Sequence, residues 1–130
     1  MPFEPVSPED ERIASLIVNA SYLVHKALGP GLLESVYEVC LAHELRKAGL
    51  DVRRQEPVPI LYHNLRFEEA FRFDLLVGER VLCEIKAVSE VHPVCMAQIL
   101  TYLKLMNLRV GFIINFHVPL IKDGIQRVVR

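Results

Sequence analysis

FRFDLLVGERVLCEIK, residues 71–86, is the stretch that decides the fold of this chain. Two apolar runs, residues 73–77 and 81–87, flank the tripeptide Gly78-Glu79-Arg80. Apolar runs of strand length on either side of a short glycine-containing loop predict a β-hairpin. We therefore expect two antiparallel strands here, with the rest of the chain arranged around them.

Three ionisable side chains interrupt this apolar pattern: Asp74, Glu84 and Lys86. Because side chains alternate between the two faces of a strand, Glu84 and Lys86 share one face with Leu82. Asp74 joins that face only if paired positions across the hairpin sum to an even number. A loop centred on Glu79 meets this condition and places Asp74 directly opposite Glu84. A two-residue turn would place Asp74 on the other face, unless a bulge intervened.

The charges on this hairpin have two explanations. Half-exposed antiparallel strands often carry cross-strand ion pairs, and the hairpin alone favours that reading. Alternatively the carboxylates bind a divalent cation, since charges on an apolar face are costly unless they are paired or coordinate a metal. Mg²⁺ prefers oxygen ligands and is usually held by one or two carboxylates. The surrounding sequence has to decide between the two.

The composition is that of one folded domain. With 130 residues, 52% hydrophobic and 24% charged, the chain predicts a single soluble globular domain over residues 1–130. No apolar run approaches the ~20 residues of a membrane span, and the acidic start MPFEPVSPEDER is unlike a signal peptide. Cys40, Cys83 and Cys95 lack zinc-site spacing, which favours reduced thiols and a cytoplasmic location.

The charge balance gives no overall signature of nucleic-acid binding, because the net charge is −1. Any contact with DNA must then come from local basic residues. The candidates are Arg46-Lys47, Arg53-Arg54, Arg66 and Arg72.

Periodicity elsewhere predicts both helices and strands. Ser7-Pro8-Glu9-Asp10 is an N-cap signature and Gly29-Pro30-Gly31 a stop, so we expect a first helix between them. Pro57 and Pro59 place the strand-like segment 50–62 at a sheet edge. The other expected elements are helices at about 33–48 and 91–107 and strands at 66–77, 80–88, 109–116 and 125–129. This order predicts a mixed β-sheet flanked by helices, in the α/β (α+β) class.

Further polar residues share faces of these helices. Glu34 and Tyr37 lie one turn apart, with Glu34 in a first turn where the helix dipole alone favours a carboxylate. Gln98 and Tyr102 lie together, off the apolar stripe of the 91–107 helix. His25 borders the apolar stripe of the first helix, where a histidine is more often packed than a ligand.

The order of helix, three-strand meander with Asp and Glu-x-Lys, helix and strand resembles the core of the PD-(D/E)XK nuclease superfamily. More narrowly, GLLESVY at residues 31–37 matches the GxxExxY motif that names a group of small proteins in it. The likeness spans roughly residues 10–130 and includes four further motifs. These are FD at 73–74, EIK at 84–86, AQILTYLK at 97–104 and GFIINF at 111–116. The resemblance implies a restriction-endonuclease-like fold and a nuclease.

The resemblance also implies a metal site. Asp74 and Glu84 look like the metal-binding carboxylates, with the Ile85 carbonyl as a further oxygen ligand. Glu34 resembles the helix-borne acid that completes the site in many relatives. The implied cofactor is Mg²⁺ or Mn²⁺, which would polarise the phosphate and activate water.

Other roles follow from the same resemblance. Lys86 looks like the residue that orients or activates the attacking water, either as a proton acceptor or as a fixed charge. Gln98 and Tyr102 resemble a supporting pair, Tyr37 ends the motif, and His25 falls where many members have histidine. The implied catalytic set is Asp74, Glu84, Lys86, Glu34 and Gln98.

The expected activity is metal-dependent hydrolysis of phosphodiester bonds, in DNA more than in RNA, by a protein that could pair with itself or another protein. One alternative is a catalytically silent nuclease-fold module that binds nucleic acid or a protein partner. The presence of every expected catalytic group counts against it. Another is a structural or assembly protein whose carboxylates form ordinary surface ion pairs. Stabilisation by Mg²⁺ would separate a metal site from that last possibility.

Overall fold

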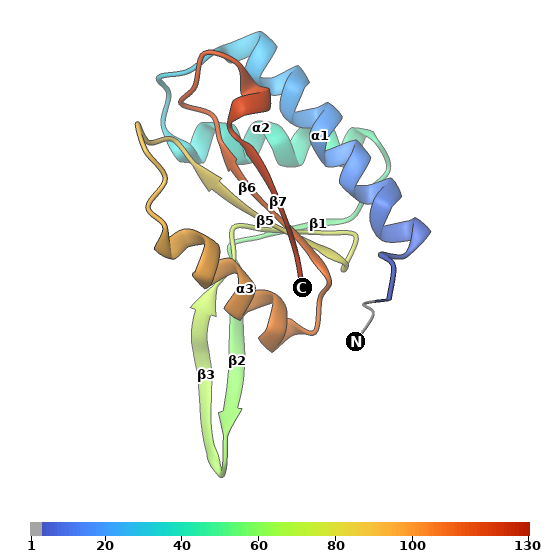
Figure 1. Cartoon of the computed structure of the whole chain (residues 1–130), viewed down its shortest axis with the longest axis vertical. Helices are drawn as coiled ribbons and strands as arrows, with labels where there is room; N and C mark the ends of the chain where they lie inside the picture. The colour runs from blue at the N-terminus through green and yellow to red at the C-terminus, as the bar shows by residue number, and fades with distance from the viewer. Residues whose placement is uncertain (1–3) are drawn as a thin grey trace.

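The computed structural model describes residues 4–130, so the first three residues of the predicted domain lie outside the described part. Three α-helices, seven strands and one 3₁₀ turn follow one another along it (Figure 1). The helices are α1 (Pro8–Leu28), α2 (Glu34–Lys47) and α3 (Val94–Met106). The strands are β1 (Val52–Arg54), β2 (Pro57–Tyr62), β3 (Leu65–Arg72), β4 (Leu75–Val77), β5 (Val81–Lys86), β6 (Val110–Asn115) and β7 (Ile125–Val129), with η1 at Ile121–Asp123.

The main sheet has five strands in the order β1-β4-β5-β6-β7. The β5–β6 pair is parallel and the other three pairs are antiparallel, so the sheet is mixed, as predicted. Every residue of β6 is buried, in agreement with the interior strand expected at 109–116.

Helices cover both faces of this sheet. Cys83 and Ile85 of β5 belong to the core that contains the α1 and α2 side chains. Leu82 belongs to a second core with Ile99 and Leu103 of α3. The alternation predicted for β5 is therefore confirmed, and the face that Glu84 and Lys86 share with Leu82 is the α3 face.

Local signals set the helix ends. The Ser7 hydroxyl accepts a hydrogen bond from the Asp10 amide at 3.1 Å, which confirms the predicted cap of α1. Gly49, with φ of +89°, follows α2 in a left-handed conformation that suits glycine. None of the helices in residues 4–130 is both long and apolar enough to cross a bilayer.

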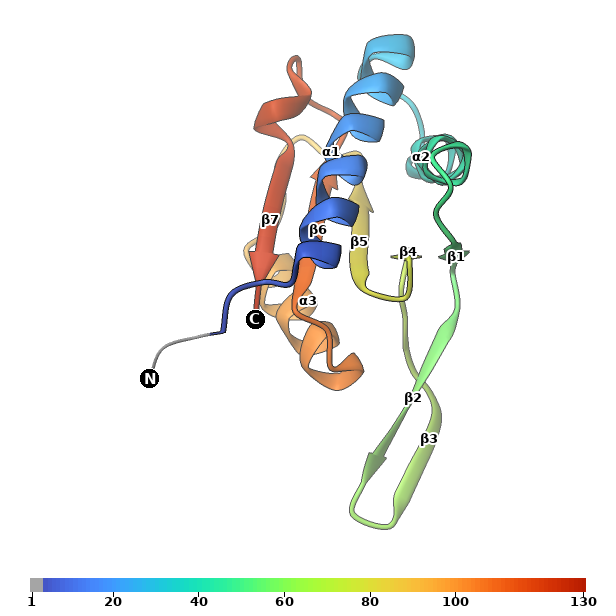
Figure 2. The same cartoon turned by 90° about the vertical axis from the view of Figure 1, so that its right-hand side faces the viewer.

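Two strand predictions were wrong in the same way. The single strand expected at 66–77 is two strands, with β3 in a separate ribbon with β2 and β4 in the main sheet. The expected strand 50–62 divides likewise, into the edge strand β1 and the ribbon strand β2. The ribbon of β2 and β3 projects from the body of the protein (Figures 1 and 2). Gln55, in the β1–β2 junction, donates its N–H to the carbonyl of Asp74, in the β3–β4 junction, at 3.0 Å.

Candidate active site

The β4–β5 hairpin has the register that the parity argument required. Leu75 pairs with Cys83, and Val77 pairs with Val81 across the loop. Gly78 and Glu79, with φ of +59° and +60°, make the sharp reversal. Continuing this register by one residue sets Asp74 opposite Glu84, so the loop centred on Glu79 is confirmed.

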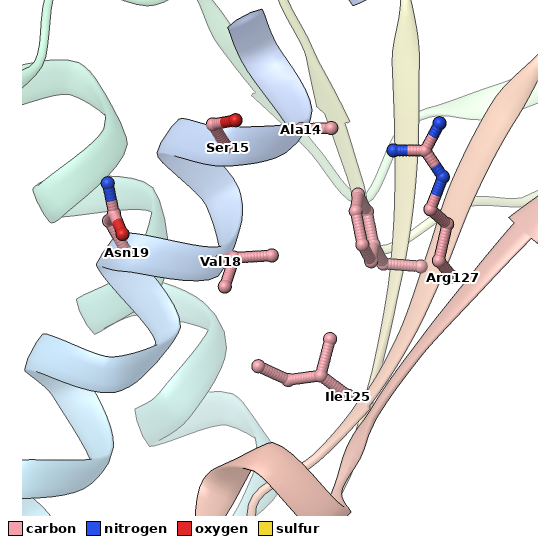
Figure 3. Close-up of a pocket in the computed structure, with 7 residues that line it drawn as sticks. Ala14, Ser15, Val18, Asn19, Ile125 and Arg127 are labelled. Atoms are coloured by element: carbon pink, nitrogen blue, oxygen red, sulfur yellow. The ribbon is translucent and has the colours of Figure 1, made fainter. Parts of the chain in front are cut away.

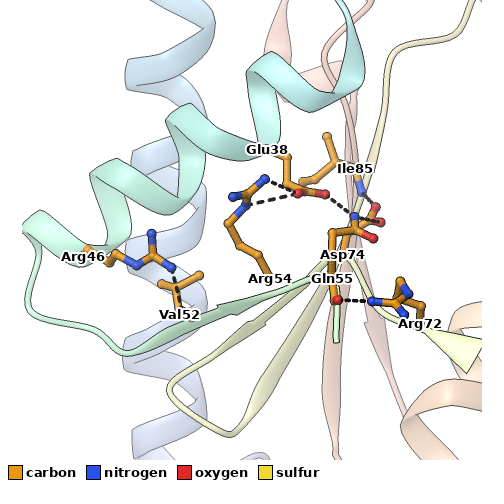
Figure 4. Close-up of polar contacts among 8 residues, drawn as sticks. All are labelled: Glu38, Arg46, Val52, Arg54, Gln55, Arg72, Asp74 and Ile85. Atoms are coloured by element: carbon orange, nitrogen blue, oxygen red, sulfur yellow. Dashed lines mark hydrogen bonds and ion pairs between the residues drawn. The ribbon is translucent and has the colours of Figure 1, made fainter. Parts of the chain in front are cut away.

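Asp74 lies where β3 and β4 separate, beside the end of β5. Its Oδ2 atom accepts a hydrogen bond from the Ile85 amide at 2.8 Å, in place of a backbone partner. Its Oδ1 atom accepts a second one, from the Gln55 side chain at 3.0 Å. Figure 4 shows the Asp74 carboxylate held between these two groups.

Glu84 is a buried acid without a full set of partners. The residue is only 9% exposed, and Oε1 has no hydrogen-bond partner among residues 4–130. Burial and, after it, the neighbouring Asp74 carboxylate raise the pKa of Glu84 to about 9, while Lys86 acts in the opposite direction. The half-buried Lys86 thus lies close enough for its charge to act on Glu84.

The carboxylate pair of Asp74 and Glu84 fits a divalent cation. Both groups supply hard oxygen atoms, and the unpartnered Oε1 of Glu84 would gain a ligand bond that offsets its burial. A magnesium ion is commonly held by one or two carboxylates and keeps several waters, so two acids suffice.

Glu34, in the first turn of α2, contacts the backbone at the end of β5. Its Oε2 atom accepts a hydrogen bond from the Ala87 amide at 3.3 Å, just past the end of β5. Within residues 4–130, no group of three or more histidine, cysteine, aspartate or glutamate side chains is arranged to hold a metal. The ligand roles of Glu34 and of the Ile85 carbonyl remain predictions.

Gln98 and Tyr102 form a connected pair on α3. The Gln98 amide donates to the Tyr102 hydroxyl at 2.7 Å, and the Tyr102 ring stacks on Phe71 with centroids 4.0 Å apart. Burial, then the charge of Glu84, raises the pKa of Tyr102. The charge of Glu84 therefore acts on Tyr102, whereas Gln98 is exposed and is hydrogen-bonded to the Tyr102 hydroxyl.

Tyr37 and His25 form hydrogen bonds with backbone groups of the α1–α2 connection and of the segment after β6. The Tyr37 hydroxyl donates to the Gly29 carbonyl at 2.6 Å and accepts from the Leu32 amide at 3.0 Å, which holds the α1–α2 connection. Its ring stacks on Phe116 directly after β6. The buried His25 forms a 2.8 Å hydrogen bond through Nε2 with the carbonyl of Val118.

Sequence reasoning missed a polar network behind Asp74. Glu38, one turn after Glu34 on α2, is 5% exposed and accepts hydrogen bonds from Arg54 and Gln55. The spacing of Glu34 and Glu38 was the available signal, since residues four apart share a helix face. The contact with Gln55 had no local signal.

The five arginines expected to contact DNA have partners within the chain. Arg53 pairs with Glu79 at 2.7 Å and Arg54 with Glu38 at 2.9 Å. Arg66 and Arg72, on the ribbon, pair with Glu68 and Glu69. Arg46 donates to the Val52 carbonyl. The four ion pairs offset positive charge that the sequence alone suggested, whereas the contact of Arg46 with a neutral carbonyl does not.

A cavity of about 340 Å³ lies between α1 and strands β6 and β7 (Figure 3). It is mainly apolar, and its only charged lining residue, Arg127, is paired with Glu11. The lining residues are Ala14, Ser15, Val18, Asn19, Phe112, Ile125 and Arg127. No acid lines it, so the carboxylate pair is the better candidate for catalysis.

Comparison with known proteins points in the same direction. A family model described as the PD-(D/E)XK nuclease superfamily matches residues 11–128, which is most of the chain. No curated protein and no solved structure matches the chain significantly.

Proposed function

The chain belongs to the PD-(D/E)XK nuclease superfamily, and from this premise we propose that it is a metal-dependent nuclease that hydrolyses phosphodiester bonds in DNA rather than RNA. Members of this superfamily are typically nucleases that use divalent metals. The proposed cofactor is Mg²⁺ or Mn²⁺, and the whole of residues 1–130 is proposed to form the nuclease domain.

One observation carries this proposal: the buried Glu84 carboxylate with an unpartnered oxygen beside Asp74. A structural ion pair would instead give Glu84 a cationic partner within hydrogen-bonding distance. The Lys86 charge acts on Glu84, but no ion pair forms between them. A site that lowers its energy by taking up a cation is the simplest account of this arrangement.

Each side chain of the proposed site would have a distinct role. Asp74 and Glu84 would hold the cation, with the Ile85 carbonyl and Glu34 as further ligands. When bound, the metal would polarise the scissile phosphate and lower the pKa of water. Lys86, on the same face, would orient the attacking water through Nζ and stabilise negative charge on the phosphate. Tyr102 would position phosphate or solvent beside the pair, held by Gln98.

Membership of the narrower GxxExxY group is proposed from the motif at residues 31–37. A cytoplasmic location is proposed from the free thiols of Cys40, Cys83 and Cys95. Association with a second copy or a protein partner also remains a proposal.

The test is cleavage of labelled single- and double-stranded DNA and RNA by purified protein with Mg²⁺, Mn²⁺ or EDTA. We expect the wild type to cleave DNA and EDTA to abolish this cleavage. The Asp74→Ala and Glu84→Ala variants should not cleave DNA. His63→Ala, at the ribbon tip, is the matched control and should retain activity. If the wild type binds Mn²⁺ but cleaves none of the substrates, the silent nuclease-fold module becomes the better description. The lack, within residues 4–130, of a third acid arranged with the pair to hold a metal is the observation that favours this alternative.

A further inference from the structure

Gln55 lies between β1 and β2 and joins two acids from different elements. Its Nε2 atom donates to Glu38 Oε1 at 2.7 Å and to Asp74 Oδ1 at 3.0 Å (Figure 4). A side-chain amide nitrogen carries two hydrogens, so each acid can receive one. The amide thereby connects helix α2 to the carboxylate beside Glu84.

The backbone of Gln55 is held in an uncommon conformation. Its φ is +50°, a left-handed value that costs a non-glycine residue about 1 kcal/mol or more. Its N–H donates to the Asp74 carbonyl at 3.0 Å, and its own carbonyl accepts from Arg72 at 2.5 Å. Gln55 is therefore fixed to Asp74 through both its backbone and its side chain.

Glu38 makes this arrangement stable. Its side chain is buried, and Arg54 donates to Oε2 through Nε at 3.2 Å and Nη2 at 2.9 Å. Arg54 therefore compensates the buried charge of Glu38, and Oε1 stays available to Gln55. The amide has a rigid, charge-balanced acceptor on one side and Asp74 on the other.

These contacts orient the Asp74 carboxylate. Gln55 holds Oδ1 and the Ile85 amide holds Oδ2, which fixes the plane of the carboxylate. A carboxylate has about four acceptor positions, so two remain for a cation. Groups that orient metal ligands in this way typically affect metal affinity roughly 10–100-fold.

We propose that Gln55, held by Glu38 and Arg54, is a positioning residue that pre-orients Asp74 to bind a divalent cation together with Glu84. This inference rests on the proposed function, because it assumes that the carboxylate pair binds a metal.

The test replaces Gln55 with glycine and measures Mn²⁺ binding by calorimetry. Gln55→Gly removes the amide and its two hydrogen bonds but also relieves the left-handed strain, so the variant should fold, with a melting temperature without metal equal to that of the wild type or modestly lower. We expect Mn²⁺ to bind roughly 10–100-fold more weakly. His63→Gly is the matched control, since His63 has φ of +52° at the ribbon tip, and it should bind Mn²⁺ as the wild type does.

Gln55→Asn provides a second variant. Asparagine tolerates the left-handed conformation and keeps an amide, but it is one methylene too short to reach both acids. It should fold and bind Mn²⁺ as weakly as the glycine variant. Wild-type affinity in a folded Gln55→Gly protein would overturn this inference alone. A wild type that binds no Mn²⁺ would overturn the proposed function, and this inference with it.

Discussion

Two buried glutamates, Glu84 and Glu38, have opposite surroundings. Arg54 and Gln55 donate to both oxygens of Glu38, whereas Oε1 of Glu84 has no partner in the described chain. Burial raises the pKa of Glu84 from 4.5 to about 9. The folded protein therefore holds this proton more tightly than the unfolded chain. Its contribution to stability is complete below about pH 4.5 and is lost as the pH rises toward 9.

We therefore expect Glu84→Gln to raise the free energy of unfolding in EDTA, by about 2–4 kcal/mol at pH 9 and less at pH 5. Glutamine keeps the shape of the side chain without its charge. Glu38→Gln is the control and should lower the free energy of unfolding by about 1–3 kcal/mol, because Arg54 loses its charged acceptor. Urea unfolding at pH 5, 7 and 9 measures both. A Glu84→Gln protein less stable than wild type at pH 9 would contradict this account of the site.

Lys86 is expected to act on the reaction rather than on the ion. Because an ammonium cannot ligate a cation, Lys86→Ala should keep its affinity for Mn²⁺ within a few-fold of wild type while cleavage falls by roughly 10²-fold or more. Calorimetry measures the affinity for Mn²⁺, and a cleavage assay on the same preparation measures the rate. Loss of Mn²⁺ binding together with cleavage would show that Lys86 organises the site as a whole.

At the scale of the element, the β4–β5 register was predictable because a strand has only two faces. If Asp74 and Glu84 lie opposite each other, the loop of the hairpin has to be centred on Glu79. The division of residues 66–77 was not predictable, because the local pattern is the same whether a strand pairs with β2 or with β5. The Gln55–Glu38 contact was equally hidden, since it depends on how α2 packs against the junction between β1 and β2.

Gly78, in the loop between β4 and β5, allows a further prediction about stability. A Cβ atom on Gly78 would lie 2.8 Å from Cδ1 of the buried Ile13, and its φ is +59°. Gly78→Ala should therefore cost about 2–4 kcal/mol, from left-handed strain plus overpacking against α1. Gly49→Ala, with φ of +89° and open space around the site, should show the strain alone, about 1–2 kcal/mol. Urea unfolding compares them, and equal losses would mean that Ile13 moves aside freely.

At the scale of the whole molecule, the order of helices and strands follows from local periodicity, and the mixed sheet follows from that order. The ion pairs that the charged residues form do not follow from local periodicity. Arg53, Arg54, Arg66 and Arg72 appear in sequence as basic patches, yet each pairs with an acid. Folding brings Glu79 to Arg53 and Glu38 to Arg54, whereas Arg66 and Arg72 pair with Glu68 and Glu69, their near neighbours in the sequence. The carboxylate pair could be predicted because two acids on one hairpin share a face. The position of Glu34 relative to it could not, because α2 and β5 meet only in the folded chain.

Cation binding should be visible in the stability of the whole fold. An ion at 100 times its Kd that binds only the native state adds about 2.7 kcal/mol, which for a domain of this size raises Tm by about 10 °C. We expect Mn²⁺ to give such a shift in the wild type and none in Asp74→Asn or Glu84→Gln, because each variant removes one of the two charged ligands. Glu34→Gln decides the role of that residue. A reduced shift would make Glu34 a ligand, and a wild-type shift would confine it to its contact with the Ala87 amide. If Mn²⁺ shifts none of these proteins, wild type included, the carboxylates form a structural cluster and the metal site is absent.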